Sequence, residues 1–138
     1  MKYTSLILAA SLAWTASASE TSSIDVTISN IKASSGQIKF ALFRGQENYD
    51  NNSSPALALT FPVDGDSLHI PLTDLPAGEY AIRVMHDENN NGKLDTNLLG
   101  MPTEQYGFSN NAGQFGPASF ADARFNPAEL TEMQIRLR

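Results

Sequence analysis

The chain has 138 residues, enough for one domain or at most two, and 41% of them are hydrophobic while 17% are charged. This balance excludes an intrinsically disordered chain and a membrane protein with several spans. The 15 acidic and 9 basic residues give a net charge of −6 and form no basic patch for nucleic acid or anionic lipid, and the absence of cysteine excludes disulfides, thiolate zinc sites and cysteine nucleophiles.

The first eighteen residues have the three parts of a secretory signal sequence. A basic start at Lys2 precedes an apolar run over 6–14, which is too short to span a bilayer, and the small residues at 16–18 form an A-x-A cleavage site. A strand or helix of the core is the alternative. We expect a signal peptide over 1–18 and a single domain over 19–138, secreted or periplasmic in a bacterium, with no membrane insertion after cleavage.

Alternating apolar and polar residues dominate the rest of the chain, which is typical of strands with one buried face. Six runs have this period of two: 24–29, 38–43, 57–63, 68–72, 80–85 and 133–138. Turn residues separate several of them, as at 34–36, 64–66 and 75–78. We therefore predict an all-β protein, an antiparallel β-sandwich of about seven strands. A short helical turn is expected near 119–124, and a mobile polar loop over 48–55.

Residues 86–117 form a long Asn-, Gly- and Pro-rich connection with no clear strand. Connections of this length are usually functional or disordered. This one contains several large apolar residues, Leu94, Leu98, Leu99, Met101, Tyr106, Phe108 and Phe115. They predict a folded segment that covers the sandwich.

The connection begins with most of a calcium loop of the EF-hand type. Oxygen-bearing side chains occupy positions 1, 3, 5 and 9, glycine occupies position 6, and the carbonyl of position 7 is a further ligand. The corresponding residues are Asp87, Asn89, Asn91, Asp95, Gly92 and Lys93. Alternate side chains of a tightly curled loop point at one centre, and the glycine permits the backbone reversal. We therefore expect Ca²⁺ to be the cofactor.

The calcium pattern is incomplete, because Leu98 stands at position 12 where an EF-hand has a bidentate glutamate. We expect Glu104 to complete the ligand set, with Glu88 as the second candidate. The low ligand charge predicts a dissociation constant of roughly 10⁻⁴ to 10⁻³ M. The alternative is a metal-free type I′ hairpin turn at Asn91–Gly92, where the same polar residues bond their own backbone.

His86 directly precedes the loop and continues the apolar face of the strand before it. It is either a satisfied histidine at the edge of the core or a functional group beside Asp87 and Glu104. In the second case, His86, Asp87 and Glu104 would serve a hydrolase-like enzyme, with Tyr106 nearby. The sequence has no other catalytic motif, so catalysis is the weaker of the two hypotheses.

Three segments, HDENNNGKLDTN at 86–97, GMPTEQYGFSNN at 100–111 and FGPASFADA at 115–123, resemble a bacterial family of unknown function, DUF2141. The resemblance implies a short secreted protein and no particular activity. The run LPAGEYAIRV at 75–84 is similar to strand entries of transthyretin-like and carboxypeptidase-regulatory-like sandwiches, which implies an Ig-like or transthyretin-like fold. We expect a binding or structural module for an unidentified protein or glycan; the alternative is a loop that merely caps one end of the sandwich.

Overall fold

The computed structural model describes residues 10–13 and 20–138, so the predicted signal peptide over 1–18 lies almost entirely outside the described residues. The described residues are mostly β, with seven strands, two short α-helices and one 3₁₀ turn. These elements are β1 (Thr21–Ser29), β2 (Gln37–Arg44), α1 (Gln46–Asp50), β3 (Leu57–Pro62), β4 (Leu68–Pro76), β5 (Tyr80–Asp87), β6 (Tyr106–Phe108), η1 (Ser109–Asn111), α2 (Phe120–Ala123) and β7 (Glu132–Arg136). In the part of the chain that the structure describes, no helix has the length and apolar character needed to cross a membrane.

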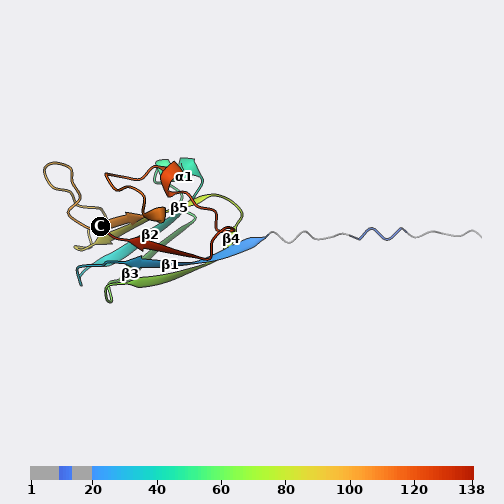
Figure 1. Ribbon diagram of the computed structural model, residues 1–138, viewed down its shortest axis with the longest axis horizontal. Coiled ribbons are helices and arrows are strands. Elements are labelled where there is room, and N and C mark those ends of the chain that lie inside the picture. Colours follow the sequence, from blue (N-terminus) through green and yellow to red (C-terminus); the bar gives the residue numbers. More distant parts are fainter. Residues whose placement is uncertain (1–9, 14–19) are drawn as a thin grey trace, which may run out of the picture.

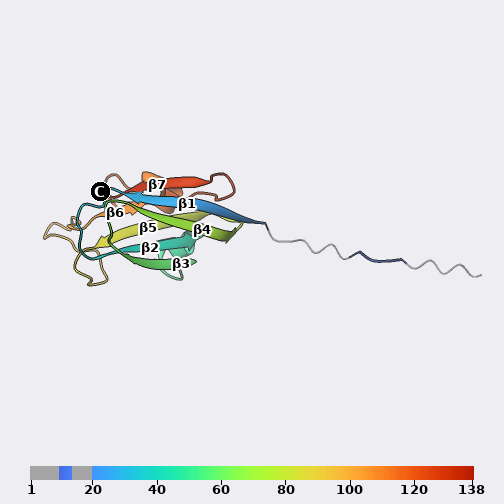
Figure 2. The same cartoon turned by 90° about the horizontal axis from the view of Figure 1, so that it is seen from below.

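The strands form two sheets that share one apolar core (Figures 1 and 2). One sheet has the order β4-β1-β7 and the other β3-β2-β5-β6. The core follows from the alternation in sequence, because every second residue of each strand faces the opposite sheet. Ile24, Val26 and Ile28 of β1 are buried in this way, as are Phe40 and Leu42 of β2.

The six predicted strand runs are confirmed, but three features of the prediction are wrong. A seventh strand, β6, interrupts the long connection, and α1 occupies part of the segment expected to be a mobile loop. The sheets are also not purely antiparallel, because β1 and β7 pair in parallel from Asp25–Glu132 to Ser29–Arg136. The expected helical turn near 119–124 is present as α2, which begins after the capping side chain of Ser119.

A second, smaller apolar core lies on the outer face of the four-stranded sheet, under α1 and α2 (Figure 1). Its members are Phe43, Tyr49, Ala81, Phe108, Ala118, Phe120 and Ala123. The buried Ser109 hydroxyl ties this core to the sheet, because it accepts a hydrogen bond from the backbone N–H of Ile82 at 2.9 Å and donates one to the carbonyl of Ala123. The two helices therefore cover one part of this face and leave the remainder open.

The long connection covers the sheets less than the sequence predicts. Its residues 88–102 lie at one end of the molecule, at the same end as the C-terminus (Figure 2). Leu98, Leu99 and Phe115 are fully or almost fully exposed, and Met101 is largely exposed. Only the part from Glu104 to Ser109 returns to the body of the protein, where Phe108 is buried.

Candidate functional site

The segment from Asp87 to Asp95 is curled by hydrogen bonds from its own backbone. The side-chain oxygen of Asn89 accepts from the N–H of Asn91 at 3.3 Å, and that of Asn91 accepts from the N–H of Lys93 at 3.1 Å. These bonds turn alternate side chains toward the inside of the curl. Gly92 has φ of 82°, so the reversal at position 6 uses a backbone conformation that glycine adopts without strain.

Asp87 is the anchor of the curl, at the last position of β5. Its Oδ2 accepts from the N–H of Gly92 at 2.8 Å and from the amide of Gln37 at 3.3 Å, and its Oδ1 accepts from the N–H of Asn91 at 3.1 Å. Burial raises the pKa of Asp87, but these hydrogen bonds, and to a lesser extent the charge of Lys39, outweigh it and hold the pKa below its usual value. The carboxylate is therefore charged at neutral pH.

Asp95 closes the other side of the curl. Its two carboxylate oxygens accept from the side-chain amides of Asn91 at 2.7 Å and Asn89 at 2.6 Å. The hydrogen bonds from Asn91 and Asn89 lower the pKa of Asp95. The side chains of Asp87, Asn89, Asn91 and Asp95 therefore belong to one hydrogen-bonded cluster, in which Asn89 and Asn91 are exposed.

Glu104, which lies sixteen residues after Glu88 in the sequence, also contacts this cluster. Its Oε1 accepts from the N–H of Glu88 and its Oε2 from the N–H of Asp95, both at 3.1 Å. The side chain is buried, and it clamps the two ends of the curl together. Thr103 adds a second link, because its N–H donates to the carbonyl of Asp95 at 2.8 Å. The sequence thus identified the right neighbour of the loop, and Glu88 enters the network through its backbone N–H.

The metal-free type I′ turn is not formed at Asn91–Gly92. That turn needs positive φ at both central residues. Gly92 has a positive φ and so does Asn90, but Asn91 does not. Within residues 10–13 and 20–138, no group of three or more His, Asp or Glu side chains converges as a metal site would require of those residue types alone. Any cation in the curl must therefore use amide and carbonyl oxygens as well.

His86 lies on the inner side of β5 and is completely buried. Its Nε2 lies 2.7 Å from the carbonyl oxygen of Ser35, so Nε2 carries the proton, and the buried Nδ1 has no hydrogen-bond partner among the described residues. His86, Asp87 and Glu104 line neither the groove described next nor the smaller cavity between Asn111 and Arg138. The geometry gives the hydrolase hypothesis no support.

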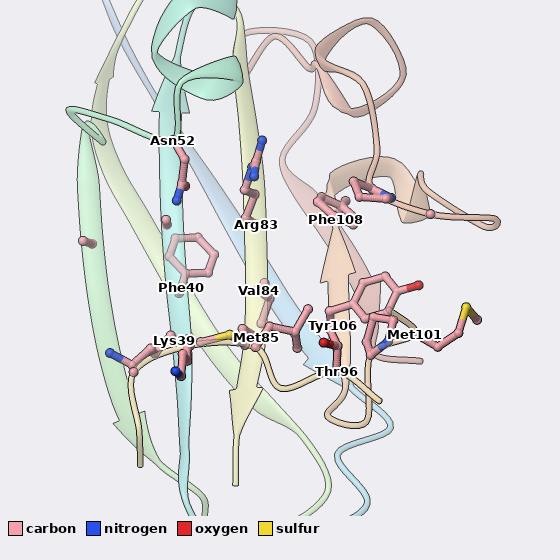
Figure 3. A pocket seen from close by; sticks show the side chains of 18 of the residues that line it. Lys39, Phe40, Asn52, Arg83, Val84, Met85, Thr96, Met101, Tyr106 and Phe108 are labelled. Carbon is pink, nitrogen blue, oxygen red and sulfur yellow. The ribbon is translucent and has the colours of Figure 1, made fainter. Parts of the chain in front are cut away.

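A groove of about 950 Å³ occupies the part of the outer sheet face that α1 and α2 leave open (Figure 3). Cross-strand pairs form its floor: Lys39 lies between Thr60 and Met85, and Ala41 lies between Ala58 and Arg83. Tyr106 and Phe108 of β6 extend these two rows. The segments 92–102 and 114–117 supply the walls.

The match to a protein-family model extends over most of the chain. The model is described as an uncharacterized protein conserved in bacteria (DUF2141), and it covers residues 26–135. The chain belongs to the DUF2141 family. No curated protein and no solved structure shows a significant match to it. The resemblance to DUF2141 inferred from the sequence is thereby confirmed, and the match spans both the segment from Asp87 to Asp95 and the groove of this DUF2141 protein.

Sequence reasoning did not find the groove. Its floor is made of outward-facing strand residues, which alternation identifies only as the solvent side of a sheet. Lys39, Arg83 and Lys93 come from three separate segments of the chain, so they form no basic run in the sequence. Tyr106 and Phe108 were expected to belong to a segment that covers the sandwich; each packs in the second core and also lines the groove.

Proposed function

We propose that this DUF2141 protein is a secreted or periplasmic binding module whose loop from Asp87 to Asp95 is ordered by a weakly bound calcium ion. The proposed ligands are Asp87, Asn89, Asn91, Lys93 through its carbonyl, Asp95 and Glu104. Their three carboxylates do not converge as a metal-binding group in this structure, so the ion would have to draw them together. An Ig-like or transthyretin-like sandwich, presenting this loop at one end, belongs to the same proposal. The partner would be a protein or a glycan.

One observation carries the proposal: oxygen-bearing side chains at alternate positions are gathered into one curl around a glycine. Calcium takes six to eight oxygen ligands and tolerates irregular geometry, whereas magnesium requires a near-ideal octahedron. In this structure the carboxylate of Asp95 accepts hydrogen bonds from the side-chain amides of Asn89 and Asn91. A bound cation would stabilise the negative charge of Asp95 in place of these donors. Each oxygen of Glu104 accepts one hydrogen bond and retains a second lone pair for a ligand role.

Calcium binding is tested by thermal unfolding of the mature protein under calcium titration, with magnesium and a chelator as comparisons. With a dissociation constant near 0.1 mM, 1 mM calcium would stabilise the fold by about 1.4 kcal/mol. We expect a rise in melting temperature with calcium, a smaller one with magnesium, and reversal by the chelator.

The matched variants are Asp95→Asn, in the curl, and Asp64→Asn, in the exposed turn between β3 and β4. Asp95→Asn should abolish the calcium-dependent rise and Asp64→Asn should retain it. An unchanged melting temperature at about 5 mM calcium, well above the expected dissociation constant, would remove the metal and leave the loop as a structural cap.

A further inference from the structure

The groove on the outer face of the four-stranded sheet has the size of a small-molecule site, and its floor combines apolar side chains with the cations Lys39 and Arg83. Its volume of about 950 Å³ lies at the upper end of the range for ligand pockets. Ala41 and Ala58 face each other across β2 and β3, and these small side chains leave the floor hollow. Met85 and Tyr106 form an adjacent cross-strand pair that borders it (Figure 3). The apolar members of the two rows, Ala41, Ala58, Met85, Tyr106 and Phe108, offer contacts to an elongated apolar group.

The charge of the groove is opposite to that of the whole chain. Lys39, Arg83 and Lys93 line it, and none of its lining residues is acidic, although the chain has 15 acidic and 9 basic residues. Both ion pairs between described residues, His69–Asp25 and Arg124–Glu79, lie elsewhere. None of the three cations forms an ion pair with a described carboxylate, although the charge of Lys39 acts on Asp87 and that of Lys93 on Asp95.

Arg83 is the cation with the most rigid setting. Its guanidinium lies 4.1 Å from the ring centre of Tyr49, and one nitrogen donates to the carbonyl of Tyr49 at 2.9 Å. Its Nε is buried and has no hydrogen-bond partner among the described residues. A buried donor without an acceptor is costly. An anionic ligand group would lower that cost by adding negative charge beside the guanidinium.

We propose that this groove, which three cations line, binds a long-chain aliphatic carboxylate, with its anionic head at Lys39 and its chain along the apolar side chains of the floor and walls. Arg83 lies toward the α1 end of the groove, where Tyr49 holds its guanidinium (Figure 3). An uncharged hydrocarbon would bury these cations without a partner, at a cost in desolvation. A neutral glycan would find no carboxylate acceptor for its hydroxyl groups among the lining residues. Met101 and Phe115, which line the two walls and are mostly exposed, supply apolar surface to cover the chain.

The groove proposal does not require the calcium proposal, although Gly92, Lys93 and Leu94 of the loop also line the groove, and a chelator keeps the two effects apart. The experiment is isothermal titration calorimetry of the mature protein with dodecanoate below its micelle concentration, in the presence of a chelator. Dodecyltrimethylammonium has the same chain with the opposite charge, and butyrate has the same head with a short chain. We expect dodecanoate to bind and both comparison compounds to fail.

Lys39→Glu and Lys32→Glu make the same charge change inside and outside the groove, since Lys32 is exposed and does not line it. We expect Lys39→Glu to weaken dodecanoate binding by about tenfold or more, which corresponds to ~1.4 kcal/mol, and Lys32→Glu to change it less than about twofold. Ala58→Glu, at an exposed position of β3, gives a second groove variant, and it should weaken binding in the same way. Circular dichroism establishes that each variant is folded.

Three results would overturn the groove proposal. The first is no dodecanoate binding by the folded wild-type protein, whatever calcium does to its stability. The second is equal affinity for dodecanoate and dodecyltrimethylammonium, or equal weakening by Lys39→Glu and Lys32→Glu, because the cations would then not select the head. The third is binding to phosphatidylglycerol vesicles without binding to monomeric dodecanoate, which would make the exposed apolar loops a membrane contact.

Discussion

At the residue scale, Asp87 connects the sheet to the loop. It ends β5 in register with Gln37 of β2, and its carboxylate accepts the N–H groups that define the curl. A buried carboxylate would ordinarily be driven toward its neutral form, but a carboxylate that accepts several N–H groups stays ionised. The start of the loop is therefore fixed by one charged group at the end of a strand.

We predict that Asp87→Asn lowers the melting temperature at pH 7 by roughly 5 °C, because an amide presents one acceptor oxygen where the carboxylate presents two. The pKa of Asp87 is lower in the folded protein than its unfolded value of about 3.9, so the unfolded state binds more protons in acid. The stabilisation by Asp87 is therefore complete above about pH 4 and is lost as the pH falls through the folded-state pKa.

The measurement is thermal unfolding of wild type and Asp87→Asn from pH 7 into acid, as far as about pH 2.5. The difference in melting temperature between wild type and Asp87→Asn should become smaller as the pH falls. Asp64→Asn, at an exposed turn, should follow the wild type throughout. If this difference in melting temperature stayed constant into acid, the stabilisation would not come from the charged carboxylate of Asp87.

At the scale of elements, the turn between β1 and β2 packs against the beginning of the loop. Gly36 has φ of 81°, and a Cβ there would lie 2.1 Å from the carbonyl oxygen of Asp87 and 2.5 Å from the Cα of Glu88. Both obstacles are backbone atoms, which cannot move without displacing the curl. Ser35 in the same turn accepts the ring N–H of His86 through its carbonyl. This turn therefore positions the loop from the side opposite to Glu104.

Gly36→Ala should destabilise the protein by about 3 kcal/mol or more, since it combines left-handed strain with a clash against backbone. Gly65→Ala is the control, because Gly65 also has a positive φ, of 103°, but nothing lies within 4 Å of its added Cβ. The control should cost only the conformational strain of about 1–2 kcal/mol. Urea unfolding of the two variants measures the difference, and equal losses would show that the close approach at Gly36 does not matter.

The sequence predicted the elements whose signal is local. Period-two alternation located six strands because each buries one face, as Ile24, Val26 and Ile28 do. β6 has only three residues, too few for a period to show, and it forms because Tyr106 pairs with Met85 and Phe108 with Arg83. The parallel pairing of β1 with β7 was also invisible, because alternation is the same in both directions. Which strands pair depends on the tertiary fold, and the local alternation of residues does not show it.

The candidate site divides in the same way. The spacing of Asp87, Asn89, Asn91 and Asp95 around a glycine predicted a curl, since those bonds span few residues. Glu104 was suggested because of its chain neighbourhood, but its action as a clamp on two backbone N–H groups depends on the path of the loop. The exposure of Leu98 and Leu99 was not predicted, since apolar composition alone does not say which residues reach the core.

At the scale of the whole molecule, the two sheets are in close contact where β6 meets the β7 edge. Gly107 is buried there, and a Cβ would lie 2.8 Å from Ile135 Cγ2 and 3.1 Å from Leu137 Cδ2. Two backbone hydrogen bonds between Tyr106 and Arg138, each 3.1 Å long, run along the same edge. The short strand β6 thus links the four-stranded sheet to the end of the other one.

Gly107→Ala should lower the free energy of unfolding by about 1–3 kcal/mol, because the added methyl group overpacks a dense contact between the sheets. Chemical denaturation followed by circular dichroism measures the loss. A variant within about 0.5 kcal/mol of the wild type would show that Ile135 and Leu137 adjust freely and that the sheets are not closely packed at this edge.

The parallel pair of β1 and β7 also governs how the molecule assembles. Asp25 and Glu132 are direct partners although 107 residues separate them along the chain. During synthesis, β1 can pair with β7 only after nearly the whole polypeptide has been made. Closing so large a loop carries an entropic cost, which slows the pairing of β1 with β7. Until β7 has paired, the backbone N–H and C=O groups on one edge of β1 are unpaired and can form hydrogen bonds with a strand of another chain.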